Sequence, residues 1–401
     1  MLNPDAVVIG DGISGLILAL GLSRKGMDIC VVSRPGSAGD NSPFILPIPA
    51  QRLLELVCPG STEELIERGA RLLTHADLIQ MKFPNHSRKP KSDKSFILLS
   101  RNLLLNFLQE KVSLAKISTQ ETEVQGLILS ERRIRGIRTQ AGDLFCANVF
   151  DCTGSPGPRK LWFGASGITT DSHITRGPRE KLYLRFFETT SERQMILRSE
   201  ENFRGGIYPL EKNLFSFSVT IPESTAPMED QIDEWADSIF RQLGATRLLE
   251  NSSPSGDWQI LNIANTASTF YRSEKSDEAQ GFYPLGDGLI FSNPIFGRGL
   301  SLFSYQITPL LQHLNDSKNL NHHFIIGHLR HGEESALQKW KEVTSGGPIW
   351  MQNLFRKLYL PLLDRNAEAY EVFLEFYQMN LTPSELLVRL ARSALSTSAL
   401  K

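Results

Sequence analysis

A glycine-rich turn between two short apolar runs constrains the fold of this chain more than any other feature. Residues 6–34 read AVVIGDGISGLILALGLSRKGMDICVVSR. The segment holds an apolar run of strand length, the pattern Gly-x-Gly-x-x-Gly, apolar residues at helical spacing, a stop at Gly26 and a second apolar run. Short unbroken apolar runs are typical of strands buried on both faces of a parallel sheet. The pattern therefore predicts a strand–helix–strand unit.

The three glycines of this turn are typical of a dinucleotide site. Gly10 permits the tight turn, Gly12 lets the backbone approach a pyrophosphate, and Gly15 allows the helix to pack closely on the strand. The helix predicted from the spacing of Leu16–Leu22 offers unpaired backbone N–H groups and the positive end of its dipole to phosphates. We expect Gly10, Gly12, Ile13, Ser14 and Gly15 to bind a cofactor.

The end of the second strand departs from the usual pattern. A carboxylate normally holds the ribose hydroxyls there, but this chain has Ser33 followed by Arg34. An arginine at this place suits the 2′-phosphate of NADP, whereas Ser33 or a loop residue such as Asp40 would make the ribose contact of FAD. The first motif alone leaves both cofactors open.

Composition excludes several classes of protein. The 401 residues include 43 basic and 44 acidic side chains, and the formal net charge of −1 gives no basic field that would attract nucleic acid. The four cysteines form no CxxC pair, so neither a disulfide framework nor a metal site is indicated. No run of 18 apolar residues and no basic leader occurs. We therefore expect no transmembrane segment and a cytoplasmic location.

A second motif far along the chain decides between the cofactors. Gly286-Asp287 ends an apolar stretch, and a Pro-x-x-Gly-x-Gly turn at 294–299 leads into an apolar helix. Together with the first motif, this resembles the FAD-dependent monooxygenases with the para-hydroxybenzoate hydroxylase-like fold, which are related to flavin-dependent halogenases and prenyl-lipid reductases. The resemblance spans roughly residues 5–310 and implies FAD as the cofactor.

The resemblance also implies roles for the residues of the second motif. In this family Asp287, next to Gly286, would bind the ribityl chain of FAD. The following turn would lie against the isoalloxazine, with the helix from Leu300 stabilising negative charge on the reduced flavin. Arg298 would face the anionic flavin, a carboxylate or a peroxide. The candidate catalytic residues are Pro294, Gly297, Arg298 and Gly299, of which Gly299 would also contact the cofactor.

Three weaker segments agree with this family in order and spacing. Ser100-Arg101 resembles the family's arginine-bearing helix, in which Arg101 would reach the pyrophosphate or ribityl region; a simple N-cap at Ser100 with a solvated arginine is the alternative. Residues 149–159 resemble the family's D-A-T-G segment and place Gly154 near the cofactor. Val124, in an apolar run before Gly126, would flank the adenine in this family, although on its own it would be read as a core residue.

The resemblance implies an α/β architecture with a discontinuous Rossmann-like FAD-binding domain of the glutathione reductase type, made of residues 1–75, 95–180 and 272–330. Residues 181–271 alternate apolar and polar side chains and include a segment of helical periodicity, so we predict an inserted substrate domain with an antiparallel sheet and a helix. Residues 331–401 show helical patterns and are predicted to form a C-terminal helical region.

The implied activity is that of an FAD-dependent monooxygenase. The enzyme would be reduced by NADH or NADPH and activate O2 as a C4a-hydroperoxyflavin that hydroxylates a small aromatic or hydrophobic substrate. In the predicted substrate sheet, Tyr183, Arg185 and Tyr208 are candidates for the substrate wall, although they would equally suit ordinary sheet positions.

Other activities of the same fold stay open. Halogenases carry a Trp-x-Trp-x-Ile-Pro motif, and the matching stretch here, Gly206-Ile207-Tyr208-Pro209, lacks the tryptophans. Further alternatives are a prenyl reductase, a flavoprotein that modifies a residue of a partner polypeptide, and a non-catalytic FAD-binding partner protein.

Overall fold

The structure is a computed structural model. It describes residues 3–36, 41–83, 94–131, 133–154, 162, 170–175, 180–190, 195–199, 202–263, 268–273, 280–291, 297–314, 322–344, 360–363, 365–379 and 381–398.

A five-stranded parallel sheet forms the centre of the part of the molecule that contains the glycine-rich turn, which we call the parallel-sheet part. Its strand order is β18-β10-β1-β2-β6, and every neighbouring pair is parallel. The predicted strand–helix–strand unit is present as β1, α1 and β2, and α1 runs from Ile13 to Ser23. The strands span Phe282–Pro284 (β18), Asn148–Asp151 (β10), Ala6–Ile9 (β1), Ile29–Ser33 (β2) and Ser118–Glu121 (β6).

Both faces of this parallel sheet are covered, which explains its unbroken apolar strands. One face carries Ala6 and Val8 and packs against a helical layer. The other face carries Val7 and Ile9 and packs against an antiparallel three-stranded sheet. The helical layer contains α1, α2 (Ile48–Val57), α5 (Arg101–Leu114) and α9 (Gly299–His313), and the covering sheet contains β7 (Val124–Ser130), β8 (Arg133–Thr139) and β9 (Gly142–Phe145).

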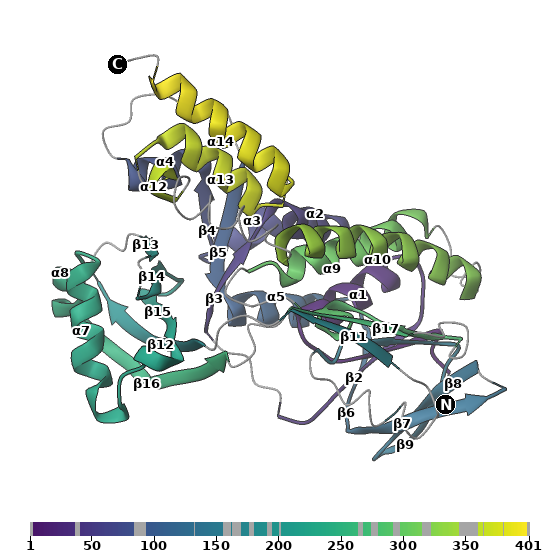
Figure 1. The fold of residues 1–401 in the computed structure, drawn as a ribbon. Coiled ribbons are helices and arrows are strands. Elements are labelled where there is room, and N and C mark those ends of the chain that lie inside the picture. Colours follow the sequence, from purple (N-terminus) through teal and green to yellow (C-terminus); the bar gives the residue numbers. More distant parts are fainter. Residues whose placement is uncertain are drawn as a thin grey trace.

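The inserted segment forms a second, antiparallel sheet with the order β13-β14-β15-β12-β16. Helix α7 (Ile232–Gln242), followed by the short α8 (Thr246–Glu250), covers its outer face, and Figure 1 shows the parallel-sheet part on the other side. The predicted combination of antiparallel strands and a helix is therefore present. The strands are β12 (Glu180–Thr189), β13 (Ile196–Ser199), β14 (Arg204–Pro209), β15 (Leu214–Pro222) and β16 (Ser252–Ile263).

The described residues form two further, smaller sheets. One has the order β3-β5-β4 and lies to the right of the inserted sheet in Figure 1, and the other has the order β11-β17-β19. Their strands are β3 (Pro43–Leu46), β4 (Arg71–Thr74), β5 (Ser95–Ser100), β11 (Thr170–Thr175), β17 (Ser268–Ser273) and β19 (Ile290–Phe291). Helices α3 (Ser61–Glu67) and α4 (His75–Lys82) flank β4 along the chain.

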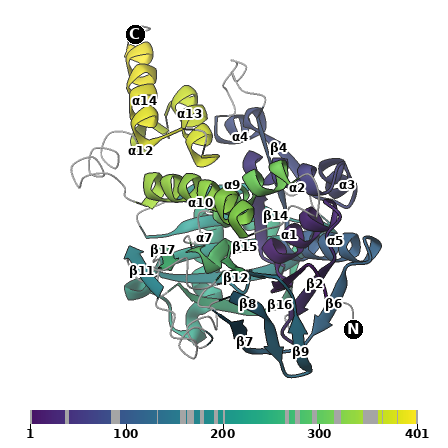
Figure 2. The ribbon, with the colours of Figure 1, turned by 90° about the vertical axis from the view of Figure 1, so that its right-hand side faces the viewer.

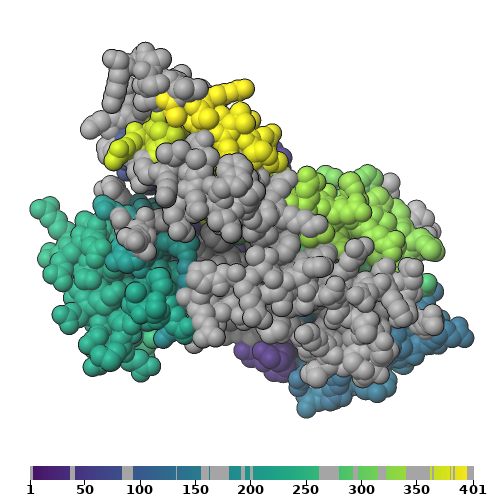
Figure 3. All heavy atoms as spheres, viewed as in Figure 1, coloured from purple at the N-terminus to yellow at the C-terminus, as the bar shows by residue number. Residues whose placement is uncertain are grey.

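The C-terminal part is helical, as predicted, but its first helix begins earlier than residue 331. Helix α10 (His322–Thr344) crosses that position and packs along α9, so no structural break falls there. The described residues that follow include the helices α12 (Leu360–Leu363), α13 (Ala367–Tyr377) and α14 (Pro383–Ser398). Figures 1 and 2 both place α13 beside α4, and α14 is exposed at the top of the molecule in Figure 3. No helix in the described ranges is long and apolar enough to cross a membrane.

Candidate cofactor and substrate site

The space around each glycine of the first motif agrees with the role predicted for it. Gly10 has a φ of +108°, and a Cβ there would lie 2.6 Å from the Cys152 carbonyl oxygen. A Cβ at Gly15 would lie 1.9 Å from the Gly10 carbonyl oxygen, so only glycine lets α1 pack this closely on the turn. A Cβ at Gly12 would meet nothing within 4 Å. The open space lies at the one glycine that is predicted to face a pyrophosphate.

The start of α1 fits a phosphate group. Its N-cap is Gly12, no side chain caps it, and its first turn, which includes Ile13 and Ser14, contains no acidic residue. Unpaired N–H groups and the helix dipole favour an anion at such an end. The residues present are therefore compatible with the diphosphate of FAD.

The second motif lies directly against the first. Gly286-Asp287 forms a short 3-10 turn, and a Cβ at Gly286 would lie 3.3 Å from the Ser14 hydroxyl. The Gly286 N–H donates to the buried side-chain oxygen of Gln306 at 2.7 Å. Gln306 belongs to α9, so this bond fixes the Gly-Asp turn on the helix that follows it. The sequence patterns contain no indication of this role for Gln306.

Asp287 lies deep in the molecule but keeps part of its surface accessible. Burial raises the pKa of its carboxyl to about 6, and the Arg101 guanidinium works in the opposite direction. A Cβ at Gly299 would lie 3.4 Å from Asp287 Oδ1. Distant segments thus bring Ser14, Gly286, Asp287 and Gly299 to one place, and Arg101 acts electrostatically on Asp287.

Arg101 begins α5, and the structure shows the N-cap at Ser100, while the cofactor role of Arg101 stays a prediction. Ser100 is the N-cap, since its hydroxyl accepts the Leu103 N–H at 3.0 Å, while the neighbouring Arg101 is close enough to Asp287 to influence its charge. The carboxylate of Glu211 also accepts hydrogen bonds from the Ser100 N–H and hydroxyl. Glu211 lies in the turn between β14 and β15 and joins the inserted sheet to the start of α5. No local sequence pattern predicts this long-range contact.

The remaining cofactor candidates occupy the edge of the parallel sheet and its surroundings. Val124 begins β7 and packs partly buried against the core behind β1 and β2. Gly154 follows β10 with a φ of +83° and open space around its Cβ position. Ser33 ends β2, and Arg34 follows it. Asp40 and Pro294 lie outside the described residues.

Arg298 is the N-cap of α9 and is only 7% exposed. Its guanidinium lies over two rings of α13, 5.5 Å from the Phe376 centroid and 5.8 Å from that of Tyr377. Burial lowers the pKa of Arg298 to about 10, and Tyr377 works in the opposite direction. A Cβ at Gly297, whose φ is +59°, would lie 3.4 Å from the Tyr377 hydroxyl. The predicted flavin-facing turn is thus in contact with the C-terminal helices, which the sequence did not indicate.

Tyr208 approaches the same place from the inserted sheet. It packs with Tyr377 against one hydrophobic cluster that includes Phe96. Burial raises the pKa of Tyr208, and the nearby Tyr377 raises it further. Phe96 meets the Tyr377 ring edge-on at 5.8 Å between centroids. The structure therefore brings Tyr208 together with Arg298 through Tyr377.

The structure does not bring Tyr183 and Arg185 to this place. Both belong to the face of β12 that packs against α7, where the Tyr183 ring lies 4.9 Å from that of Trp235 and Arg185 forms an ion pair with Asp233. Tyr208 lies on the opposite face. The prediction of a substrate wall needs this correction, because alternation along a strand identifies two faces without saying which one a helix covers.

A buried polar cluster anchors α13 beside this site. His75 is fully buried; its Nε2 accepts the Gln378 side-chain N–H at 2.9 Å, and its Nδ1 lies 3.9 Å from the Glu375 carboxylate. Lys94 forms an ion pair with the same carboxylate. Burial lowers the pKa of His75, partly offset by Glu375. We interpret the cluster as structural, since it fixes the turn of α13 that ends in Tyr377.

Solved structures of known proteins share this architecture. The flavin-dependent brominase Bmp2 matches with a TM-score of 0.67 and 15% identity over 100% of both chains. PqsL of Pseudomonas aeruginosa, described as a probable FAD-dependent monooxygenase, matches with a TM-score of 0.64 and 18% identity over 88% of this chain and 100% of its own. The chain has the fold of the FAD-dependent monooxygenases and halogenases.

A third structure with this fold acts on a polypeptide. The peptidyl tryptophan dihydroxylase QhpG, essential for tryptophylquinone cofactor biogenesis, matches with a TM-score of 0.59 and 16% identity over 86% of this chain and 74% of its own. No protein-family model and no curated protein sequence matches the chain. At identities of 15, 16 and 18% these likenesses show the monooxygenase fold, and they confirm the predicted resemblance at that level.

Proposed function

We propose that this protein is an FAD-dependent oxidoreductase of the monooxygenase type, which uses NADH or NADPH and O2 to hydroxylate a small aromatic or hydrophobic substrate. The observation that carries the proposal is the meeting of Ser14, Gly286, Asp287 and Gly299 beside the open start of α1. Each of these residues belongs to a motif that the resemblance assigns to FAD, and they lie together although they come from distant segments.

Each part of the site has a distinct task in this proposal. The backbone at Gly12 and the start of α1 hold the diphosphate, Arg101 balances its charge, and Asp287 accepts hydrogen bonds from the ribityl hydroxyls. FAD, when bound, supplies the redox chemistry that activates O2. The start of α9 and Arg298 provide a positive field at the flavin-facing turn. The inserted sheet and α13 exclude water from the space above that turn.

Two measurements test the proposal. Apo-protein titrated with FAD should become yellow and quench flavin fluorescence, and Asp287→Ala should weaken binding about tenfold or more, because hydrogen bonds to a deeply bound ligand are lost. Oxidation of NADH or NADPH and release of peroxide are then followed with candidate substrates. Equal FAD affinity in the parent and Asp287→Ala would refute the site, and FAD binding without any NAD(P)H oxidation would favour a non-catalytic partner protein.

Arg34 tests which cofactor occupies the first motif. If that motif holds FAD, no 2′-phosphate is present and Arg34→Ala leaves FAD binding unchanged, while Ser33→Glu is tolerated or tightens it. If the motif holds NADP, Arg34→Ala weakens NADPH binding by about tenfold or more, since a charge-assisted pair is lost. Selective loss of NADPH affinity would overturn the FAD assignment.

Two comparisons favour alternative reactions. The likeness to QhpG supports modification of an aromatic residue in a partner polypeptide, and the likeness to Bmp2 over both full lengths supports halogenation. The stretch Gly206-Ile207-Tyr208-Pro209, which lies in β14, lacks the halogenase tryptophans, so we place halogenation below hydroxylation. Mass spectrometry of products formed with and without bromide distinguishes oxygen insertion from halogenation.

A further inference from the structure

Three side chains from distant segments converge beside the flavin-facing turn. Arg298 comes from the start of α9, Tyr377 from α13 and Tyr208 from β14. The guanidinium lies 5.8 Å from the Tyr377 ring centroid, and the Tyr377 hydroxyl is 3.4 Å from the Cβ position of Gly297. Two phenolic O–H donors and one cation thus meet at a helix N-terminus, which itself attracts negative charge.

The neighbouring sheet face adds a further donor. Ser216 lies directly opposite Tyr208 in the β14–β15 ladder, and residues paired in this way share a face. Its hydroxyl is fully buried and has no hydrogen-bond partner among the described residues. A buried polar group without a partner is unfavourable, and a ligand that pairs with it removes that cost.

The walls around these donors are aromatic. Phe376 lies 5.5 Å from the Arg298 guanidinium, and Phe96 meets Tyr377 edge-on. On the same helix, the Glu375 carboxylate forms an ion pair with Lys94. The place thus combines positive charge, hydroxyl donors and aromatic rings.

We propose that Arg298, Tyr377 and Tyr208 bind an anionic oxygen on an aromatic substrate, with Tyr377 of the C-terminal helices as a specificity-determining residue. This rests on the proposed function, since it assumes that the turn faces the reacting site. Arg298 supplies the charge, the two tyrosines donate hydrogen bonds to the anion, and the rings of Phe96 and Phe376 contact the aromatic part of the substrate.

The test uses FAD-loaded, oxidised protein and two probes of nearly equal shape, benzoate and the neutral benzamide. Binding is followed by perturbation of the flavin absorbance and by calorimetry. Benzoate should bind about tenfold or more tightly than benzamide, because only benzoate forms charge-assisted hydrogen bonds. Tyr377→Phe should weaken benzoate binding about tenfold and leave benzamide nearly unchanged.

Tyr370→Phe is the matched control, since it removes a hydroxyl from the same helix without altering a residue of the proposed site. FAD content and thermal unfolding are measured first for each variant, so a protein that fails to bind FAD reports on the proposed function and not on this inference. Equal binding of the two probes, no binding of benzoate at millimolar concentration, or equal effects of Tyr377→Phe and Tyr370→Phe in FAD-loaded protein would overturn the inference.

A second inference concerns the carboxylate that the end of β2 lacks. In the parallel β2–β6 pair Ser33 lies opposite Glu121, and the Thr122 N–H donates to the Ser33 carbonyl at 2.8 Å, which fixes this register. The Gly36 N–H donates to Glu121 Oε1 at 3.2 Å, so the carboxylate reaches over the end of β2. Its other oxygen has no hydrogen-bond partner in the part of the chain that the structure describes.

We infer that Glu121 holds the ribose hydroxyls of the FAD adenosine in place of the carboxylate that Ser33 replaces. Neighbouring parallel strands end at the same edge of the sheet, so a side chain at the end of β6 can contact a ligand that usually binds at the end of β2. Glu121 would accept hydrogen bonds from the hydroxyls, as a carboxylate at the end of β2 does.

FMN separates this contact from the rest of the site because it lacks the adenosine. Apo-protein is titrated with FAD and with FMN, and flavin fluorescence gives both dissociation constants. Glu121→Gln should weaken FAD about tenfold and leave FMN unchanged, and the control Glu123→Gln should change neither. An unchanged dissociation constant for FAD, or equal losses for FAD and FMN, would overturn the inference.

Discussion

The β1–α1–β2 unit and the inserted sheet differ in which groups they leave available to a ligand: backbone groups in the first and side chains in the second. In the first, both faces of the strands are apolar and covered, and the backbone of the turn at Gly12 is left to meet a ligand. In the second, one face is an aromatic core under α7, and the other carries polar residues such as Tyr208 and Ser216. In our proposals the first region binds its ligand through the main chain, and the second through the side chains of one face.

This difference determines how each region responds to substitution. A turn that packs backbone against backbone tolerates no additional atom at Gly15, whatever the side chain. In the inserted sheet, the face under α7 buries large aromatic rings, whereas the other face buries a mixture of apolar side chains and polar ones such as Ser216. Removing a ring from the first face should therefore cost more stability than removing a hydroxyl from the second. Single substitutions at neighbouring positions can therefore distinguish residues that stabilise the fold from residues that are available to a ligand.

The largest effect is expected within the inserted sheet. Phe217 is fully buried under α7, with its ring 4.6 Å from that of Phe240, and Phe217→Ala should lower the free energy of unfolding by about 3–5 kcal/mol. The adjacent Ser216→Ala should be neutral or slightly stabilising in the apo-protein, because it removes a buried hydroxyl without a partner among the described residues. Denaturant unfolding measures both, and similar losses would contradict the assignment of the two faces.

Asp287 gives the next largest effect and couples stability to pH. Burial raises its pKa from 3.8 to about 6, against the opposite influence of Arg101. Below pH 3.8 both the folded and the unfolded state hold the proton. As the pH rises to 6, the unfolded state loses it first, so the apo-protein becomes less stable by on the order of 3 kcal/mol.

Asp287→Asn removes this penalty. The variant should be more stable than the parent as apo-protein above pH 6 and equally stable below pH 3.8, while it binds FAD about tenfold more weakly. Thermal or denaturant unfolding across this pH range, together with a FAD titration, checks both parts. A parent stability that rises between pH 4 and 6 relative to the variant would contradict the buried environment of Asp287.

Two glycines of the first motif allow packing and ligand binding to be compared within a single turn. A Cβ at Gly15 would lie 1.9 Å from a backbone oxygen, so Gly15→Ala should destabilise the apo-protein by about 1–3 kcal/mol. Gly12 has a φ of −67° and open space around it, so Gly12→Ala should leave the apo-protein stable and weaken FAD binding. Unfolding of both apo-variants and a FAD titration of Gly12→Ala give the answer. Loss of apo stability in Gly12→Ala would mean that the space is not a ligand site.

The first region could be predicted from the sequence because its signals are local. Within about thirty residues, the glycine spacing and the apolar runs specify β1, the turn, α1 and β2. The electrostatic influence of Arg101 on Asp287 could be predicted only through the family resemblance, because neither segment contains a local signal that relates it to the other.

The second region could be predicted as a sheet but not as a site. Alternation in β12 marks Tyr183 as belonging to one face, yet the packing of α7 decides that this face is core. Tyr377 and Glu121 were missed for a related reason. Their roles come from contacts between α13 and the α9 turn and from the register of β2 and β6, which depend on tertiary structure.

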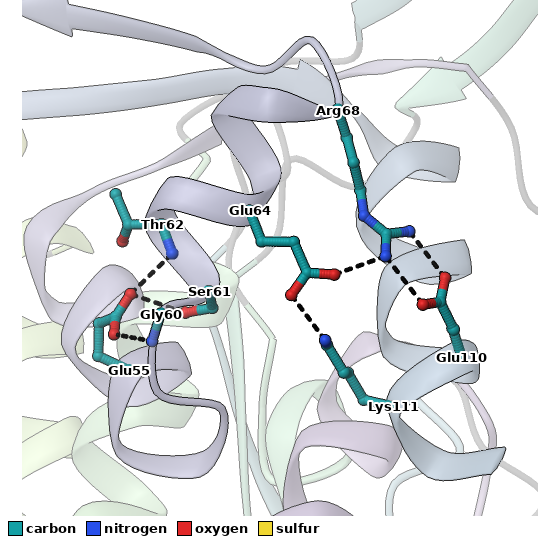
Figure 4. Close-up of polar contacts among 8 residues, drawn as sticks. All are labelled: Glu55, Gly60, Ser61, Thr62, Glu64, Arg68, Glu110 and Lys111. Atoms are coloured by element: carbon teal, nitrogen blue, oxygen red, sulfur yellow. Dashed lines mark hydrogen bonds and ion pairs between the residues drawn. The ribbon is translucent and has the colours of Figure 1, made fainter. Parts of the chain in front are cut away.

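The smallest effect concerns a helix cap that no local pattern predicts. Glu55 of α2 accepts hydrogen bonds from the Gly60 and Thr62 N–H groups, at 2.9 and 2.7 Å, and from the Ser61 hydroxyl at the start of α3 (Figure 4). Burial raises the pKa of Glu55, but these hydrogen bonds outweigh it and hold the pKa below its ordinary value of 4.5. The bonds stabilise the charged carboxylate at a helix N-terminus, where negative charge is favoured.

Glu55→Gln should therefore lower the free energy of unfolding by about 1 kcal/mol at neutral pH. The pKa is depressed in the folded state, so this stabilisation is present above pH 4.5 and disappears as the pH falls through the folded-state pKa, where parent and variant converge. Glu110→Gln is the control: Glu110 pairs with Arg68 on the surface of the same layer (Figure 4), where solvent screens the pair, and its loss should hardly matter. Denaturant unfolding at neutral and acidic pH distinguishes the two, and an equal change in both variants would mean that Glu55 is another surface charge and not a cap.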